Sequence, residues 1–114
     1  MTLPKNLSTI EDNAFAGCYS LTILTIPDSL TSIGERAFSY CYNLTSITLP
    51  NSLTSIGNDT FDNCSHLTSI TLPNFLTSIG ENAFYWCSRL TSITIPRNCK
   101  CQDSFYKGPK IVRK

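Results

Sequence analysis

Apolar and polar positions along this chain repeat with a period of 23 residues. Blocks that begin at prolines, 4–26, 27–49, 50–72 and 73–95, place their apolar residues in seven shared columns. Four of these columns are Leu7, Leu30, Leu53 and Leu76; Ile10, Ile33, Ile56 and Ile79; Phe15, Phe38, Phe61 and Phe84; and Cys18, Cys41, Cys64 and Cys87. A period of 20 to 50 residues is typical of stacked units that cannot bury their apolar faces alone. The pattern therefore predicts a solenoid.

Each repeat contains two short runs with the alternation expected of a half-buried strand. Residues 47–49 (Ile-Thr-Leu) read inward, outward, inward. Pro50 has no N–H to give to a ladder and ends this run. Residues 52–56 form a second extended run with two inward apolar positions. Gly57, like the glycines one repeat before and after it, predicts a backbone corner that other residues resist.

The remaining part of each repeat predicts a helical turn. In residues 35–41, Ala37, Phe38 and Cys41 are spaced so that they share one side of a helix. A helix this short does not form in isolation, so packing of Phe38 on the strands must hold it. The fold class predicted is thus an α/β repeat, a leucine-rich-repeat solenoid whose 23-residue units each have two short parallel-stacking strands and one helical turn.

The domain prediction is one array followed by a terminal cap. Residues 1–98 hold the four repeats and the start of a fifth, whereas 99–114 form a degenerate cap and basic tail, with Phe105 and Ile111 filling the last core positions. The net charge of +1 hides an asymmetry: 1–98 carry four basic and seven acidic residues, and 99–114 carry five basic and one acidic. So short a basic tail is a solvated terminus rather than a nucleic-acid or membrane site. We expect neither nucleic-acid binding nor membrane insertion.

The repeat resembles a known family. Leu44, Ile47 and Leu49 match the Leu-x-x-Ile-x-Leu core of leucine-rich repeats, although Ser52 stands where the commonest form has Asn. The longer pattern Leu-x-x-Ile-x-Leu-Pro-x-x-Leu-x-x-Ile-Gly-x-x-Ala-Phe-x-x-Cys is similar to the BspA-like (Treponema-type) repeats over residues 4–96. This resemblance implies surface or secreted proteins that bind host or matrix proteins, without catalytic residues. The chain shows no signal peptide, so a surface location would require an upstream segment.

The cysteines predict packing rather than chemistry. The four column cysteines are expected to be buried free thiols that act as small apolar residues. Neighbouring rungs lie close enough for disulfides, but parallel side chains point the same way, which is the wrong geometry. Cys99 and Cys101 have three interpretations: a cap feature, a disulfide pair, or two misaligned core positions. Their spacing lacks the partner ligands of a zinc site, and no cofactor is predicted.

No constellation of catalytic residues is visible. The single histidine, His66, shares a column with Ser20, Asn43 and Arg89, and we expect it to lie at the surface. No carboxylate pair, nucleophile with a base, phosphate loop or zinc-protease helix accompanies it. The chain is therefore predicted not to be an enzyme.

The informative variation lies on the predicted helical-turn face, where aromatic residues replace small ones from repeat to repeat. Exposed Tyr and Trp are enriched at binding surfaces. The predicted contact patch for a protein partner is Tyr40, Tyr42, Tyr85, Trp86 and Arg89. We hypothesise a non-catalytic protein-interaction module, using this face or the sheet. The alternatives are a structural unit that self-associates end to end through its exposed edges, and, third, an ice-binding surface made of the regular Ser and Thr ladders.

Overall fold

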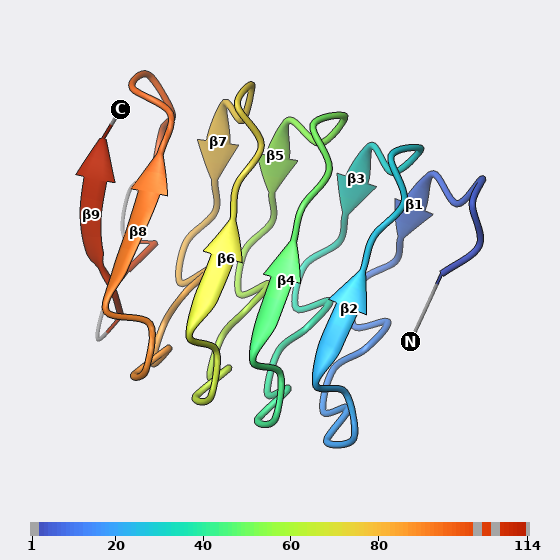
Figure 1. The fold of residues 1–114 in the computed structure, drawn as a ribbon, viewed down its shortest axis with the longest axis horizontal. Helices are drawn as coiled ribbons and strands as arrows, with labels where there is room; N and C mark the ends of the chain where they lie inside the picture. Colours follow the sequence, from blue (N-terminus) through green and yellow to red (C-terminus); the bar gives the residue numbers. More distant parts are fainter. Residues whose placement is uncertain (1–2, 102–103, 106–107, 114) are drawn as a thin grey trace.

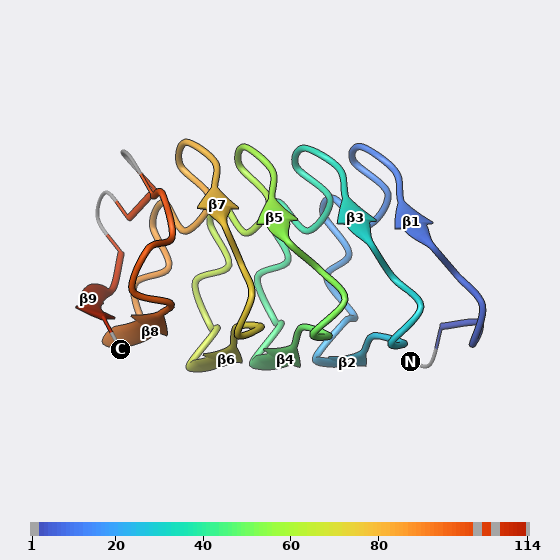
Figure 2. The same cartoon turned by 90° about the horizontal axis from the view of Figure 1, so that it is seen from above.

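The chain winds into a coil of stacked rungs, one 23-residue repeat per rung. In the computed structural model, which describes residues 3–101, 104–105 and 108–113, the strands form two parallel rows (Figure 1). Seen from above, the rows lie on opposite sides of the coil (Figure 2). β1 and β2 lie at one end of the stack, and β8 and β9 lie at the other. The predicted solenoid is confirmed.

The first row contains four strands that lie just before prolines and the C-terminal strand. They are β2 (Ile23–Thr25), β4 (Ser46–Thr48), β6 (Ser69–Thr71), β8 (Ser92–Ile95) and β9 (Lys110–Arg113). β2, β4 and β6 pair in parallel with a register of 23 residues, so that Leu24 lies beside Ile47, and Ile47 beside Ile70. β8 and β9 form a separate parallel pair. Alternation buries the central residue of β2 and β4 and exposes the threonine that follows it.

The second row contains the shorter strands. They are β1 (Thr9–Ile10), β3 (Ser32–Ile33), β5 (Ser55–Ile56) and β7 (Ser78–Ile79). β1 pairs with β3, and β5 with β7, again at a 23-residue register. Each strand turns its isoleucine into the core and its polar residue outward. Both predicted strands of the repeat are therefore present.

The predicted helical turn is wrong: none of the described residues is helical. In residues 35–40 the backbone makes consecutive turns, and Arg36 and Tyr40 have φ of 58° and 60°, which a right-handed helix cannot accommodate. The N–H groups donate to the next rung instead: Phe38 to the Thr60 carbonyl at 2.9 Å and Tyr40 to the Asp62 carbonyl at 2.8 Å. The apolar spacing resembled a helix because turns and helices can both place residues three apart on one side.

This turn ladder runs through the whole stack. It joins Phe15 to Ala37, Phe61 to Ala83 and Phe84 to Ser104, with N···O distances of 2.8 to 2.9 Å. By contrast, β3 and β5 lie in contact without a strand pairing, and so do β6 and β8. The turns therefore supply a third hydrogen-bonded side that bridges the places where the strand rows are interrupted.

A column of stacked phenylalanine rings forms the centre of the core. Neighbouring centroids are 5.3 to 5.5 Å apart and the rings are within 14° of parallel, from Phe15 through Phe38, Phe61 and Phe84 to Phe105. Offset-stacked pairs of this kind contribute about 0.5–1.5 kcal/mol each beyond their burial. The predicted ring column is confirmed, including the position of Phe105 at its end.

The cysteine column is buried beside these rings, as predicted, and all six cysteines are free. Cys41, Cys64 and Cys87 are fully buried, whereas Cys18 in the first rung is half-buried. Each buried thiol donates to the carbonyl of the phenylalanine 26 residues earlier; for Cys64 and the Phe38 oxygen the distance is 3.1 Å. The thiols are thus both packing groups and links between rungs.

Two of the three glycine corners, at Gly34 and Gly80, are explained by close approach rather than by unusual backbone angles. A Cβ built on Gly80 would lie 2.6 Å from the backbone N of Asn58 and would also meet its side-chain oxygen. Gly34 faces Asp12 in the same way. These side-chain oxygens accept the N–H of the residue after the glycine, from Glu35 and Glu81 at 2.8 and 2.9 Å. The missing side chain is what lets the acceptor reach that N–H.

The C-terminal part adds a shortened rung. β9 pairs Ile111 with Ile93 and Arg113 with Ile95. Arg113 Nη1 donates to the carbonyls of Arg97 and Cys99, each at 3.1 Å, which holds β9 against the preceding loop. Cys99 is buried, and Cys101 packs against the core cluster. Of the charges predicted for the basic tail, Asp103, Lys107 and Lys114 lie outside the described residues.

Candidate partner-binding surface

The five residues of the predicted patch all lie on the turn edge, which comprises residues 12–20, 35–43, 58–66 and 81–89. Tyr40, Tyr42 and Trp86 are 44%, 37% and 42% exposed. Arg89 is exposed and Tyr85 is half-buried. Aromatic rings with this exposure leave part of their apolar surface in contact with water.

The structure divides the patch into two groups. Tyr42 stacks on Tyr19 of the preceding rung, with centroids 5.6 Å apart and planes within 5°. Tyr40 meets Tyr42 edge-on at 5.8 Å and 78°. Tyr85 and Trp86 form a second edge-on pair at 5.8 Å and 89°. The first group lies on the first two rungs and the second on the fourth.

The backbone under Tyr40 and Trp86 is left-handed. Their φ values are 60° and 59°, and the same position in the other two full rungs is occupied by Gly17 and Asn63. Glycine and asparagine adopt this conformation easily, whereas a bulky L-residue costs roughly 1–2 kcal/mol there. The turn requires the backbone angle in every rung, but it does not require an aromatic side chain.

One carboxylate lies beside the tyrosines. Asp62 is half-buried, and its side chain accepts a hydrogen bond from Asn63 Nδ2 at 2.5 Å. Burial raises the pKa of the Asp62 carboxyl, and the Asn63 bond and the Arg36 charge oppose that rise only in part. The pKa of Tyr42 is raised by partial desolvation, by Tyr19 and Tyr40, and by the charge of Asp62. Nearby, Arg36 and Asp59 form an ion pair, with 3.8 Å between Arg36 Nη2 and Asp59 Oδ2.

His66 and the column cysteines are reactive residue types that lie on or beside the turn edge. His66 was expected at the surface but is half-buried, and its Nδ1 has no hydrogen-bond partner in the structure. Burial raises the pKa of the Cys41 thiol to about 11 and that of Cys87 to about 12, which keeps both protonated and unreactive. No group of three or more His, Cys, Asp or Glu among the described residues could hold a metal ion. No described helix could cross a membrane.

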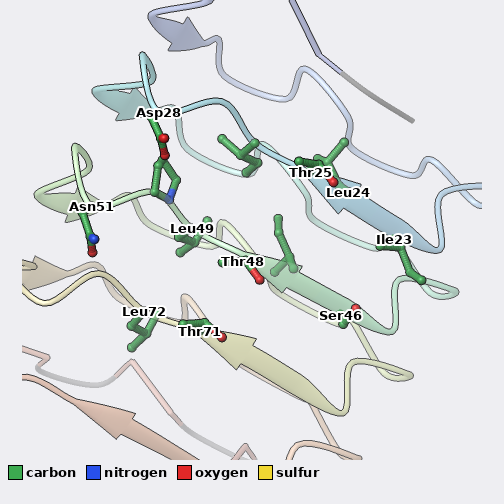
Figure 3. Close-up of a pocket in the computed structure, with 13 residues that line it drawn as sticks. Ile23, Leu24, Thr25, Asp28, Ser46, Thr48, Leu49, Asn51, Thr71 and Leu72 are labelled. Atoms are coloured by element: carbon green, nitrogen blue, oxygen red, sulfur yellow. The ribbon is translucent and has the colours of Figure 1, made fainter. Parts of the chain in front are cut away.

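The sheet made of β2, β4 and β6 carries a second candidate surface. A shallow depression of about 380 Å³ crosses these strands and the loops that follow them (Figure 3). Thr25, Thr48 and Thr71 lie in a row along it, and Asp28 and Asn51 stand at its edge. Its surface is almost uniform from rung to rung, in contrast to the turn edge.

Five exposed apolar or aromatic residues among those described were missed by the sequence prediction. Two of them, Ile111 and Val112, are 40% and 44% exposed on β9, so the prediction that Ile111 fills a core position is wrong. Tyr19 is 59% exposed and belongs to the tyrosine group, and its signal was its place in the same column as Tyr42. Ile23 and Phe75 are 58% and 73% exposed. Both replace serines that recur in their columns, at Ser46 and at Ser52, and Ser52 donates to the Leu30 carbonyl of the preceding rung. For both residues, an apolar side chain in a column that otherwise holds polar residues was the sequence signal for an exposed apolar position.

Parallel strands at a 23-residue register, around leucine, phenylalanine and cysteine columns, define a leucine-rich-repeat solenoid. More narrowly, the chain belongs to the BspA-type leucine-rich repeat family, whose model, a region of six copies, matches residues 1–111. This agrees with the resemblance drawn from the repeat pattern. A search of curated proteins found no significant match.

Solved structures agree with this assignment. The leucine-rich repeat protein TpLRR of T. pallidum superposes with a TM-score of 0.83 at 32% identity, over 88% of this chain and 49% of that protein. A leucine-rich cell surface protein of Faecalibacterium prausnitzii gives 0.85 at 29% identity, over 97% and 31%. A leucine-rich repeat protein of Bacteroides ovatus gives 0.83 at 32%, over 96% and 32%. The chain therefore spans about half of the first protein and about a third of the other two.

Proposed function

We propose that this chain is a non-catalytic protein-binding module and that its partner docks on the aromatic residues of the turn edge. The observation that carries the proposal is the pair Tyr40 and Trp86, at positions where Gly17 and Asn63 satisfy the same left-handed turn. Folding does not need aromatic side chains there, and the backbone disfavours them. Outliers of this kind are concentrated at functional sites, where binding offsets their cost.

The family and the surface composition support the proposal. Solenoids offer long, rigid surfaces that suit protein recognition. Tyr, Trp and Arg are the residues most enriched among those that dominate binding energy, and the turn edge presents all three in Tyr42, Trp86 and Arg89. The F. prausnitzii relative is described as a cell surface protein. We therefore include exposure at a cell surface in the proposal.

The experiment compares the turn edge with the sheet. A partner is first identified by an unbiased pull-down, and its affinity is then measured for the chain and for Tyr40→Asn with Trp86→Asn. Asparagine is the right replacement because Asn63 already holds the same backbone conformation. Loss of about 2 kcal/mol or more of binding free energy, with an unchanged circular dichroism spectrum, is the expected result for two central aromatic contacts.

The matched control changes the sheet and leaves the turns intact. Thr48→Ala with Thr71→Ala removes two hydroxyls from the depression on β4 and β6. We expect this variant to bind as the parent does. If the sheet variant loses the partner and the turn variant keeps it, the turn edge is not the docking surface. The self-assembly hypothesis is tested separately, because sedimentation of a clean monomer at high concentration would remove it.

A further inference from the structure

The tyrosine cluster, Tyr19, Tyr40 and Tyr42, has a geometry that goes beyond general aromatic exposure. Tyr19 and Tyr42 are stacked, whereas the Tyr40 ring stands nearly perpendicular to Tyr42. Two rings at 78° with centroids 5.8 Å apart form the walls of a corner, and both remain partly open to solvent. The faces of such rings carry partial negative charge, which attracts a cation within about 6 Å.

A carboxylate lies next to this corner. The Tyr40 N–H donates to the Asp62 carbonyl at 2.8 Å, so the two residues are direct neighbours across the turn ladder. The negative charge of Asp62 also contributes to the raised pKa of the Tyr42 phenol, after desolvation and the two neighbouring tyrosines. The tyrosine rings and Asp62 thus lie on adjacent rungs of the turn edge, joined through the Tyr40 backbone.

Within the described ranges, no ion pair to the Asp62 carboxylate is formed. Arg36 forms its ion pair with Asp59, at 3.8 Å, and reaches Asp62 only through longer-range attraction. Asn63 supplies a neutral hydrogen bond to the Asp62 side chain. Burial and the neighbouring charge of Asp59 raise the pKa of the Asp62 carboxyl, so a cation placed beside it would favour its ionised form. A cation brought by another molecule would supply what the chain itself does not.

We propose that the tyrosine cluster and Asp62 together bind a cationic side chain, lysine or arginine, of the protein partner. The proposal rests on the proposed function and specifies the chemistry of its first contact group. Charge complementarity argues for this occupant, because residues 1–98 carry seven acidic and four basic side chains. An acidic group would be repelled by Asp62, and a purely apolar group would leave the carboxylate desolvated without a partner.

The test uses three small probes: Nα-acetyl-lysine amide, Nα-acetyl-arginine amide and the neutral Nα-acetyl-glutamine amide. Ring resonances of the assigned tyrosines are followed by NMR while each probe is added to the whole chain. Saturable shifts at the tyrosine cluster with the two cationic probes, and none with glutamine amide, are expected. Asp62→Asn should weaken binding about 2- to 5-fold, since exposed cation–π and ion-pair contacts are individually small.

Two variants separate a local effect from a general one. Asp28→Asn removes the same charge from the edge of the sheet depression and should leave probe binding unchanged. Tyr42→Phe keeps the ring and should bind the cations nearly as well, whereas Tyr42→Leu should bind them less well. Equal shifts with glutamine amide, or equal affinities for the two Asp variants, would overturn the cation assignment. The proposed function fails by a different result: partner capture that survives the Tyr40 and Trp86 replacements.

Discussion

At Tyr40, where the backbone is left-handed, we expect the glycine variant to be more stable than the alanine variant, which reverses their usual order of stability. At an ordinary position, alanine is more stabilising than glycine by roughly 0.5–1 kcal/mol, because glycine loses more freedom on folding. At a φ of 60°, an L-residue costs about 1–2 kcal/mol that glycine avoids. The difference between the midpoints of these two ranges favours Tyr40→Gly over Tyr40→Ala by about 0.7 kcal/mol. Both variants lack the tyrosine ring, so the loss of its contacts does not affect the difference in stability between them.

Tyr42 provides the matched control two residues away. It is a similarly exposed tyrosine on the same turn edge, but it is not among the residues with positive φ. Tyr42→Ala should therefore be more stable than Tyr42→Gly by about 0.5–1 kcal/mol. The free energy of unfolding of the glycine variant minus that of the alanine variant should therefore be positive at position 40 and negative at position 42. The two values should differ by on the order of 1–2 kcal/mol.

Urea unfolding measures both differences. With a slope of about 1–3 kcal/mol per molar for a small protein, the expected differences move the midpoint by a few tenths of a molar or more. Tyr40→Asn should lie at or above the alanine variant, since asparagine tolerates the left-handed region. An alanine variant at position 40 that matches or exceeds the glycine variant would refute the backbone argument and remove the main support for the proposed docking surface.

The remaining predictions concern the core and the corners. Phe61→Ala should destabilise the chain by about 3–5 kcal/mol in urea unfolding, because Phe61 lies between two rings, whereas the half-buried Phe15 should cost less. Gly80→Ala should cost on the order of 1–3 kcal/mol, since its Cβ would meet Asn58, and Gly57→Ala, whose nearest atoms are at 3.4 Å, should be close to neutral; similar costs would contradict the close-approach explanation. Cys64 is buried, and its thiol pKa is raised by that burial. Pulsed alkylation at pH 8 should modify it only after unfolding, and modification at the unfolded-chain rate would show that the column is accessible.

The main error of the sequence prediction concerned the turns. Ala37, Phe38 and Cys41 are all buried on one side, as the spacing indicated. The spacing did not reveal that the backbone is left-handed at Arg36 and Tyr40. In the column of Tyr40, Gly17 and Asn63 are residue types that favour a left-handed backbone, and they were the available clue. Repeats two and four have an aromatic residue at this position, which does not indicate such a backbone. The division of the predicted patch into two groups could not be read from the sequence either, because ring contacts depend on side-chain direction.

The sequence by itself determined the solenoid, its 23-residue period and the residues of its core. These follow from the recurrence of apolar residues at fixed positions, since each rung must cover the apolar face of the next. The tertiary structure decided how the third side of the coil is bonded and where charge meets aromatic rings. Tyr42 and Asp62 are 20 positions apart in the chain, and only the stacking of adjacent rungs lets the charge of Asp62 act on Tyr42. That proximity depends on the register of the turn ladder, which no single repeat specifies.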